Sequence, residues 1–465
     1  MSASASQFKR DAVRLTADLR HRSLIQTALG NYEIKRDEKK ALFQDYNGAR
    51  QLAAEIKWEA INRLDRHLEQ FVRGLEARGT KVHWATTARQ ACDIIVGIAR
   101  SKAARSIVKS KAMTAEEIHL NPALEHAGFE VVESDLGEFI VQLRDEPPYH
   151  IVFPAMHLTR GEIQRTFKDK LHDAPSDNPE ALTLVARRVL RQKYVQADIG
   201  ITGANFAVAE TGMISVTENE GNARLTAALP KTMITLLGIE KIVPRLDDLA
   251  LLLPMLATVG AGQLISGYNT LYGGPRQPGE TDGPDEFHVV LLDNNRTALL
   301  ANAEQRDALH CIRCGSCLNV CPIYRHIGGH TYATTYPGPI GGVITPNLRG
   351  LQDWKHLSYS SSLCGACTEA CPVKIDLAHH LLQNRRNASR RKPSWWQKIA
   401  FKLFAPVANG RIPWMLVTKG GRFGQRFHGL IKGTRIDPAY CWTRTRDVPR
   451  IAKQSFKEWW RENRK

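Results

Sequence analysis

The sequence predicts a mixed α/β fold joined to a second, helical domain, and three observations lead to this expectation. Short apolar segments alternate with helical patterns between residues 79 and 296, which is typical of a layered fold with a mostly parallel sheet. Two cysteine-rich runs follow within residues 297–388, and residues 389–465 are basic and rich in tryptophan. Residues 1–78 have a helical pattern, so the 465 residues divide into four regions.

The N-terminal region is expected to supply packing surface. Apolar residues recur there at steps of three and four residues, which places them on one helical face. They are Ala53, Ile56, Ala60, Leu64 and Leu68. A polar loop is expected around Asn31 and Tyr32.

The α/β region contains eight candidate strands, each short and apolar. They are residues 82–85, 106–109, 129–133, 150–153, 198–203, 213–216, 232–237 and 287–292. Thr87 is expected to cap a helix over residues 88–100, and residues 114–117 have the sequence of a capping box that opens another helix. Further helices are expected at 179–196, 206–210 and 293–309. Ligands of such sheets bind at the carboxyl ends of the strands.

Two loops of this region are candidate ligand sites. The first contains Gly200, Gly203 and Asn205, and it is expected to join a strand to a helix, where backbone N–H groups can bind an anion. The second follows a strand directly and contains Glu218 and Asn222. Residues 109–111 could add positive charge to the same crevice.

Both loops also have a plain structural explanation. Tight turns use glycine routinely, and polar loops are often only solvated. Neither loop is a dinucleotide fingerprint or a phosphate loop. Residues 270–285, rich in glycine and proline, either cover a site or contact a partner.

The two cysteine runs are the most specific signal in the chain. The first is Cys311, Cys314, Cys317 and Cys321 followed by proline, a C-x2-C-x2-C-x3-C-P spacing that holds iron–sulfur clusters in bacterial-type ferredoxins. The second run contains three cysteines, Cys364, Cys367 and Cys371, and is also followed by proline. Because 42 residues separate the runs and helical segments flank them, we expect a helical, ferredoxin-like domain with two clusters.

The spacing also predicts which cysteines share a cluster. In this motif the fourth cysteine of a run binds the other cluster. Cluster 1 is therefore assigned to Cys311, Cys314, Cys317 and Cys371, and cluster 2 to Cys321, Cys364 and Cys367. Both are expected to be 4Fe-4S clusters.

Cluster 2 has only three evident cysteine ligands. Ser361 stands where a fourth cysteine would complete the second run, and a hydroxyl is a poor ligand for a soft metal site. The fourth position could be Ser361, a distant side chain such as Cys441, a water, or nothing, as in a three-iron cluster.

Zinc and disulfides are the alternatives for these cysteines. Structural zinc takes four ligands, which fits seven cysteines in this order poorly. Disulfides require an oxidising compartment, whereas the N-terminus lacks the apolar segment of a signal peptide. The longest uncharged stretch, residues 249–274, is interrupted by polar residues and proline, so a cytoplasmic location is expected.

The excess of positive charge lies in the C-terminal region. Residues 385–465 hold 21 of the 64 Lys and Arg but only four of the 47 Asp and Glu, and six of the nine tryptophans. Three roles are considered: docking on an acidic partner subunit, contact with an anionic membrane surface, and nucleic-acid binding, which is the least favoured.

Several segments together resemble one bacterial family, the lactate utilization protein B family. They are residues 82–85, 110–113, 116–118, 133–138, 201–212 and both cysteine runs, so the resemblance covers nearly the whole chain. The missing cysteine at Ser361 is also absent in that family, and Thr80 is a light departure, where a second glycine is expected.

The resemblance implies a fold, a process and partners. It implies that residues 79–296 form a LUD domain, of the type shared with CoA transferases and ribose-phosphate isomerases. It also implies a role in oxidising L-lactate, a small organic acid, to pyruvate together with two proteins of the same operon, a cysteine-rich reductase-like subunit and a second LUD-domain protein. Because no flavin or nicotinamide fingerprint is legible, we expect this chain to conduct electrons rather than accept the hydride. The alternative is a ligand-binding redox sensor without turnover of its own.

Overall fold

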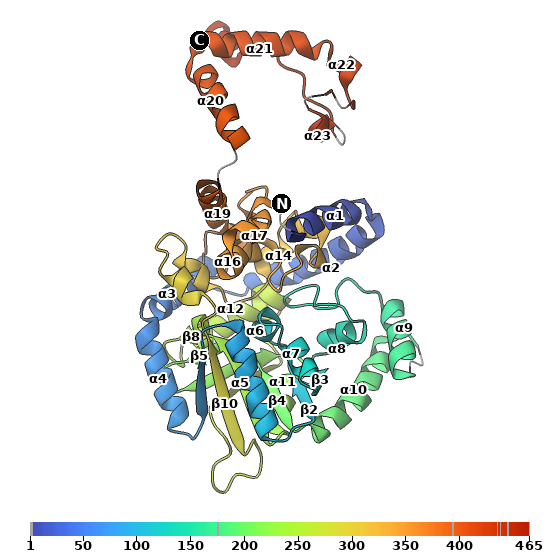
Figure 1. Cartoon of the computed structure of the whole chain (residues 1–465), viewed down its shortest axis with the longest axis vertical. Coiled ribbons are helices and arrows are strands. Elements are labelled where there is room, and N and C mark those ends of the chain that lie inside the picture. The colour runs from blue at the N-terminus through green and yellow to red at the C-terminus, as the bar shows by residue number, and fades with distance from the viewer. Residues whose placement is uncertain are drawn as a thin grey trace. The chain divides into compact units, whose positions relative to one another are not determined.

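The computed structural model describes residues 3–173, 176–392, 395–434, 436–437, 439–443 and 446–464. The chain forms two compact units, Met1–Ala388 and Ser389–Lys465, whose internal structure is described separately below. Figure 1 shows the elements of both units along the chain.

A six-stranded parallel sheet is the centre of the first unit. Its strand order is β1-β10-β7-β4-β2-β3. The strands are β1 (Lys81–Ala85), β2 (Ser106–Lys109), β3 (Glu130–Glu133), β4 (Ile199–Thr202), β7 (Thr232–Gly238) and β10 (Glu286–Leu292). The central strands β4 and β7 are buried along their whole length, as expected when helices cover both faces of a parallel sheet. This sheet and the helical domain after it confirm the predicted fold class.

A smaller four-stranded sheet lies beside the first. Its order is β8-β5-β6-β9, from β5 (Phe206–Val208), β6 (Met213–Glu218), β8 (Ile242–Val243) and β9 (Tyr268–Tyr272). β5 pairs antiparallel with β6 and parallel with β8. Because β5 and β8 directly follow β4 and β7 in the chain, the second sheet continues from the carboxyl ends of two central strands of the first.

Helices surround the large sheet. They are α5 (Ala88–Ser101), α6 (Met113–Glu117), α7 (Leu120–His126), α8 (Leu136–Leu143), α9 (Arg160–Leu171), α10 (Pro179–Gln196), α11 (Asn222–Ala228) and α12 (Leu249–Ala261). Two of the predicted helices are confirmed closely: α10 has the expected bounds, and Thr87 Oγ1 accepts a hydrogen bond from Gln90 N at the start of α5.

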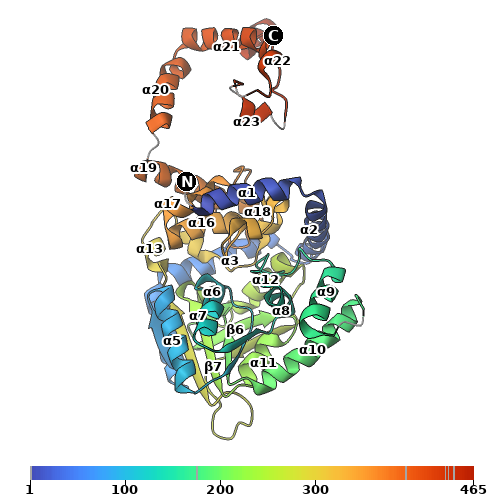
Figure 2. The same ribbon diagram turned by 45° about the vertical axis from the view of Figure 1, so that its right-hand side comes forward.

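The N-terminal helices pack against the cysteine-rich domain. They are α1 (Ala3–Ala17), α2 (Leu19–Lys40) and α3 (Tyr46–Asn62), whereas α4 (Leu64–Glu76) packs on the sheet, with Phe71 in the same core as Val289. The cysteine-rich domain consists of α13 (Arg296–Leu300), η2 (Arg306–His310), α14 (Ser316–Asn319), α15 (Tyr324–Ile327), η3 (His330–Tyr332), α16 (Gly338–Arg349), α17 (Leu351–Tyr359), α18 (Ala366–Ala370) and α19 (Leu377–Arg391). Ile25 and Leu29 of α2 share one hydrophobic core with Leu318 and Tyr324. Figure 2 shows α1, α16 and α17 stacked together at one end of the sheet.

Two expected elements of the α/β region are wrong. Residues 150–153 form an irregular loop, because His150 Nδ1 accepts hydrogen bonds from the amides of Val152 and Phe153 and turns the chain. Residues 206–210 are not a helix, because Phe206–Val208 is the buried strand β5. The loop at Gly200 and Gly203 therefore has no helix N-terminus after it.

Three further expectations about helices are also corrected. The expected helix 293–309 is broken into α13 and η2, with Asn294 and Asn295 in the left-handed region. The expected capping box at 114–117 does not form, because α6 starts at Met113 without a side-chain cap and Glu117 pairs with Arg296 instead. The expected loop at residues 31–32 lies inside α2.

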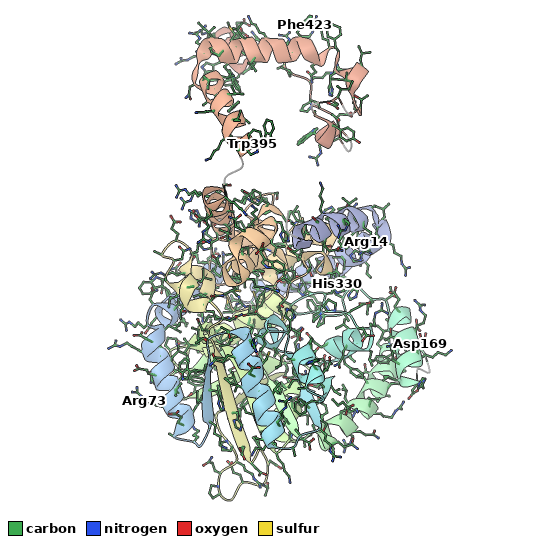
Figure 3. The ribbon with its side chains drawn as sticks, in the orientation of Figure 1. Arg14, Arg73, Asp169, His330, Trp395 and Phe423 are labelled. Carbon is green, nitrogen blue, oxygen red and sulfur yellow. The ribbon has the colours of Figure 1, made fainter. Side chains whose placement is uncertain are left out.

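The second unit consists of short helices with exposed aromatic residues. They are α20 (Trp395–Asn409), α21 (Arg411–Gln425), α22 (His428–Ile431), α23 (Tyr440–Thr443) and α24 (Phe456–Asn463). Trp395 and Phe423, labelled in Figure 3, are 58% and 62% exposed. Among the described residues no helix is both long enough and apolar enough to cross a bilayer.

Replacing Gly200 by alanine is expected to destabilise the protein by about 1–3 kcal/mol, because a Cβ there would overlap the carbonyl oxygen of Thr226 on α11. Gly97 is the matched control, since it lies in α5 and a Cβ there meets nothing within 4 Å. Gly97→Ala should be neutral or stabilising by up to about 1 kcal/mol. Anaerobic urea unfolding of both variants measures the difference, and equal stabilities would contradict the close packing of α11 on β4.

Candidate iron–sulfur centre and the adjoining cavity

The seven cysteines of the two runs lie in two groups. Cys311, Cys314, Cys317 and Cys371 line one cavity, so that three come from the first run and one from the second. In the other group, Cys321 and Cys364 lie near enough to Cys367 to raise the pKa of its thiol. This grouping has the crossed pattern that the spacing predicts, while the ligand assignment itself stays a prediction.

The same local turn presents the cysteines of both runs. Gly315 follows Cys314 in the first run and Gly365 follows Cys364 in the second, and their φ angles are 75° and 82°. Glycine adopts this left-handed conformation without steric cost, and each turn then opens into a short helix, α14 or α18. The residues before these turns, Arg313 and Leu363, also have positive φ. The two runs are thus repeats in conformation as well as in sequence.

Backbone amides point at the sulfur atoms. Ile375 N donates to Cys371 Sγ at 3.3 Å. Backbone amides near Cys314, Cys317, Cys321, Cys364 and Cys367 act to lower the pKa of these thiols, against the effect of burial. Burial and the neighbouring thiols raise the pKa of Cys371 to about 12, so bare thiolates would be costly here. Iron would stabilise the thiolates, and hydrogen bonds to sulfur are typical of cluster sites. The residues therefore fit a cluster.

The spacing of the sulfur atoms does not fit a single zinc ion. In a tetrahedral site with Zn–S bonds of about 2.3 Å, the four sulfurs lie within about 4 Å of one another. Within the described part of the chain, the groups of three or more potential ligand atoms lying within 4.8 Å contain glutamate and histidine but no cysteine. A cluster spreads its ligands more widely.

The N-terminal helices hold the second cysteine run in place. From α3, Arg50 Nε donates to the carbonyl oxygen of Cys371 at 3.0 Å, and Arg50 Nη2 donates to that of Thr368 at 3.4 Å. On the other side, a Cβ at Gly260 of α12 would lie 3.2 Å from the carbonyl oxygen of Cys314. The hydrogen bonds of Arg50 and the close packing of α12 at Gly260 thus fix backbone segments that carry cysteines.

The fourth ligand position of cluster 2 has one sequence candidate that the structure describes. Ser361 Oγ accepts a hydrogen bond from Leu363 N at 3.1 Å, and the Ser361 carbonyl accepts one from Arg385 Nη2 at 2.7 Å. The hydroxyl thus takes part in the turn that leads to Cys364, which is exposed. The side chain of Cys441, the distant candidate, lies outside the described residues.

A cavity of about 340 Å³ opens at the carboxyl end of the parallel sheet. Four of the five candidate loop residues line it: Gly203, Asn205, Glu218 and Asn222. Gly200 does not line it, because it lies inside β4 against α11. The segment 270–285 contributes no lining residue, because it runs from β9 to the amino end of β10, where Asp285 N donates to the carbonyl oxygen of Lys231. The two loops thus meet in one site, as expected from the rule for parallel sheets.

Three carboxylates on one side of the cavity are held by backbone amides. Glu218 accepts from the amides of Ala223 and Arg224 at 2.7 and 2.9 Å. Glu220 accepts from Leu136 N at 2.9 Å, and Asp135 caps α8. Burial and the charge of Asp135 raise the pKa of Glu220 to about 7.

Two cations in the cavity wall escaped the sequence analysis. Lys241 follows β7, and Arg313 lies inside the first cysteine run. Burial and the nearby Arg313 lower the pKa of Lys241 to about 8. Arg313 also lines the cavity that holds the four cysteines of cluster 1, so one side chain borders both cavities. For Lys241, the signal available in the sequence was its position three residues after the buried strand β7.

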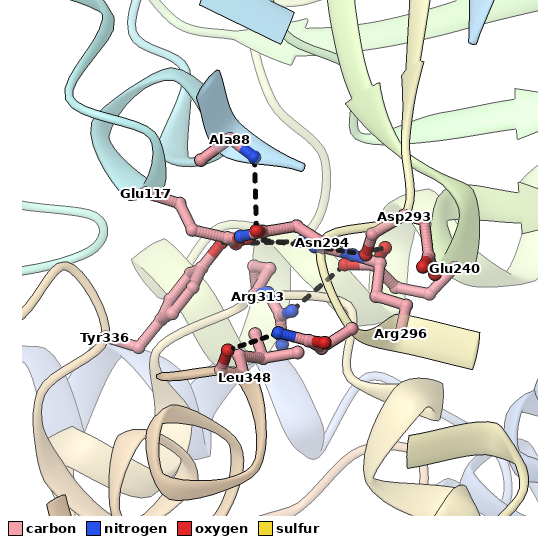
Figure 4. Close-up of polar contacts among 10 residues, drawn as sticks. Ala88, Glu117, Glu240, Asp293, Asn294, Arg296, Arg313, Tyr336 and Leu348 are labelled. Carbon is pink, nitrogen blue, oxygen red and sulfur yellow. Dashed lines mark hydrogen bonds and ion pairs between the residues drawn. The ribbon is translucent and has the colours of Figure 1, made fainter. Parts of the chain in front are cut away.

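A buried ion network joins the two domains at this place (Figure 4). Arg296 pairs with Glu117 Oε2 at 2.8 Å and with Glu240, and Glu240 Oε1 pairs with Arg313 Nη2 at 3.0 Å. Tyr336 Oη donates to Glu117 Oε2 at 2.7 Å. The two arginines hold the pKa of Glu240 down at about 2 despite its burial. The cysteine run is thereby fixed to the end of the sheet.

A second buried charge cluster lies under the cavity. Lys109 at the end of β2 is fully buried and pairs with Glu133 at 2.8 Å and Glu116 at 3.1 Å. Glu138 lies beside these carboxylates, and burial together with the charges of Glu133 and Glu116 raises its pKa well above 4.5.

Replacing Glu138 by glutamine is expected to stabilise the protein more at pH 8 than at pH 5. Between pH 4.5 and its raised folded pKa, Glu138 ionises only in the unfolded chain, so the free energy of unfolding falls as pH rises. Glutamine removes this loss. Anaerobic thermal unfolding of the wild type, Glu138→Gln and the exposed control Glu125→Gln at both pH values tests this, and an equal gain at both pH values would contradict it.

Comparison with known proteins places this geometry in a family. The LUD domain model matches residues 68–292, and the 4Fe-4S dicluster domain model matches residues 307–375. The second match indicates iron–sulfur clusters in the domain that carries the two cysteine groups.

Curated relatives match almost end to end. Lactate utilization protein B of Oceanobacillus iheyensis is 44% identical over 96% of this chain and 94% of its own. The proteins of the same name from Shouchella clausii and Bacillus velezensis are 46% and 42% identical, over 90% and 99% of this chain and 88% and 95% of their own. A solved DUF162 family protein from Deinococcus radiodurans covers 49% of this chain and 98% of its own at 15% identity, with a TM-score of 0.28, too low to support any argument. From the curated relatives it follows that the chain belongs to the lactate utilization protein B family.

Proposed function

We propose that this chain is the iron–sulfur electron-transfer subunit of a multi-protein system that oxidises L-lactate to pyruvate and allows growth on lactate. The observation that carries this proposal is the pair of cysteine groups within a dicluster domain. The relatives are named for lactate utilization, which supports the substrate. We also propose the two partners that the resemblance implies, the reductase-like subunit and the second LUD-domain protein.

The positions of the two groups suit electron transfer through the chain. Cys314, Cys317 and Cys371 of the first group are buried beside the cavity, whereas Cys364 of the second group is exposed. Cys367 lies near enough to Cys317 to affect its pKa, so the two groups adjoin. Clusters that accept one electron each, one inside and one reaching the surface, can pass the two electrons of a lactate oxidation to a partner one at a time.

The basic C-terminal unit is proposed to dock on an acidic partner subunit, with an anionic membrane surface as the alternative occupant. Its aromatic side chains are exposed, among them Trp395, Trp396 and Trp414. Aromatic and basic side chains together are enriched where proteins bind partners and membrane surfaces.

Growth on L-lactate tests the proposed function. In a strain lacking the chromosomal gene, Cys311→Ala and Cys364→Ala are expected to abolish growth on L-lactate as sole carbon source and to leave growth on pyruvate intact. Cys92→Ala is the matched control, since Cys92 is buried in α5 outside both groups. Immunoblots confirm equal amounts of each variant. Normal growth of both cluster variants on L-lactate would reject the electron-transfer role.

A redox-sensing role is the second candidate, and Arg313 favours it because this side chain borders both the cavity and the cysteines of cluster 1. Ligand-dependent changes in the cluster spectra, without lactate turnover by the reconstituted three-protein set, would select this role.

A further inference from the structure

Three side chains that can ligate a metal ion meet where the α/β region contacts the cysteine-rich domain. One ring nitrogen each of His157 and His330 and one carboxylate oxygen of Glu146 all lie within 4.8 Å of one another. Glu146 and His157 belong to the segment between α8 and α9, whereas His330 begins η3. His330 is labelled in Figure 3, between the two regions. Sequence spacing does not reveal this group, because 173 residues separate the two histidines.

Two of the three side chains are oriented by contacts on the side away from the group. Arg144 binds Glu146 Oε1 through Nε at 3.0 Å and Nη2 at 2.8 Å, which leaves Oε2 for the histidines. His330 Nε2 donates to the carbonyl oxygen of Pro147 at 2.7 Å, so the lone pair of the neutral ring lies on Nδ1. Metal-binding histidines usually have such a carbonyl or carboxylate partner on the other ring nitrogen, and metal-binding carboxylates are hydrogen-bonded in turn.

His157 completes the group from the buried side. Its ring stacks on Tyr149 with centroids 4.6 Å apart, and its Nε2 lies 2.8 Å from Glu146 Oε2. Its Nδ1 is buried without a hydrogen-bond partner among the described residues, so the contact with Glu146 alone leaves the ring only partly satisfied. Burial lowers the pKa of His157 to about 4 although Glu146 opposes this shift, so the ring is neutral at pH 7. Neutral imidazole is the form that binds metal ions.

The donor set and its exposure select a class of ion. Two imidazole nitrogens and one carboxylate oxygen suit zinc and similar divalent transition metals, whereas Ca²⁺ and Mg²⁺ prefer oxygen ligands. The side chains of Glu146 and His157 are 28% and 10% exposed, and His330 lines a cavity of about 250 Å³, so an ion from solution can reach the group. The iron–sulfur clusters do not account for the group, because none of its three ligands is a cysteine and none lines the cavity of cluster 1.

We propose that Glu146, His157 and His330 bind one divalent transition-metal ion of the zinc type, which ties the α/β region to the cysteine-rich domain. His330 lies nine residues after Cys321, so the bound ion would hold the segment that follows the first cysteine run. Water from the adjoining cavity would supply the fourth ligand of a tetrahedral ion. The site is independent of the proposed electron-transfer role, since it uses none of the cluster cysteines.

Zinc binding is tested on the full-length holoprotein under anaerobic conditions. After titration with Zn²⁺ and removal of the excess, metal analysis is expected to find about one zinc ion per chain beside an unchanged iron content. X-ray absorption at the zinc edge should then show only nitrogen and oxygen neighbours, at about 2.0–2.2 Å. Sulfur neighbours at about 2.3 Å would place the zinc in the cysteine groups. That result, or the absence of bound zinc, would overturn the proposal.

Matched variants locate the site. His330→Ala is expected to weaken zinc binding at least about tenfold, because loss of a direct ligand should cost no less than loss of a group that only orients one. His126→Ala is the control, since His126 is exposed at the end of α7, and it should bind zinc as the wild type does. Unchanged zinc affinity in folded His330→Ala would overturn the assignment.

Thermal unfolding provides a second measurement, because an ion that binds only the folded state stabilises it. The unfolding midpoint should rise with Zn²⁺ in the wild type and in His126→Ala, and stay unchanged in His330→Ala. If His330→Ala does not fold, Glu146→Gln replaces it, since the amide oxygen still accepts from Arg144 while the carboxylate charge is lost. An equal rise in the wild type and in the folded site variant would contradict the proposed ligands.

Discussion

Replacing Cys371 by alanine is expected to remove cluster 1 and to leave cluster 2 in place. Cys371 lies in the second run but lines the cavity of Cys311, Cys314 and Cys317. The iron content of anaerobically reconstituted protein should therefore fall from about eight to about four atoms per chain, since each cubane holds four irons. EPR of the reduced protein should keep one cluster signal and lose the interaction between two.

The complementary variant makes this prediction specific. Cys321→Ala, in the first run, should remove cluster 2 and keep cluster 1, because Cys321 lies with Cys364 and Cys367. Cys92→Ala should keep both clusters. If Cys371→Ala instead lost the signal assigned to the cluster of Cys364, the crossed assignment would be wrong. Loss of both clusters in both variants would show that they assemble only together.

Replacing Glu240 by alanine is expected to destabilise the first unit by about 3–5 kcal/mol, because removing one partner of a buried network leaves uncompensated charges. Glu240 is 1% exposed and pairs with both Arg296 and Arg313, so its loss leaves two buried guanidinium groups short of a carboxylate. Anaerobic denaturant unfolding measures the change. Iron content should be measured in the same samples, since Arg313 belongs to the first cysteine run.

A surface ion pair provides the control. Glu286 pairs with Lys81 and Lys102 at the amino ends of β10 and β1, and its side chain is 30% exposed. Glu286→Ala should cost less than about 1 kcal/mol, because exposed ion pairs contribute little. A loss of similar size in both variants would contradict the view that this network fixes the cysteine run to the sheet.

The local part of the structure could be predicted from the sequence. The strands β1, β2, β3, β4, β6, β7 and β10 can be predicted because each is a short apolar run between turn residues. The predictions failed where a particular contact, rather than the apolar pattern, decides the conformation. Phe206–Val208 is a strand only because β6 and β8 flank it, and His150 leaves the strand pattern because its own ring accepts two backbone amides.

The candidate site was likewise predictable only in part. Gly203, Asn205, Glu218 and Asn222 were identified because they follow strands, and they line the cavity, whereas Gly200 resembles them in sequence but packs against α11. Lys241 and Arg313 could not be predicted as cavity residues, because neither the strand pattern nor the cysteine spacing indicates which cavity their side chains border.

The sequence by itself determined the cysteine spacing, and with it the kind of cofactor and the family, because cluster ligation depends on residues a few positions apart. Only the tertiary structure decided that Arg313 of the cysteine run and Lys241, which follows β7, border one cavity, since the docking of two domains brings together side chains that are 72 residues apart. The physical reason is that a buried charge is tolerated only where a partner is supplied, and that partner is set by packing between domains rather than by local sequence.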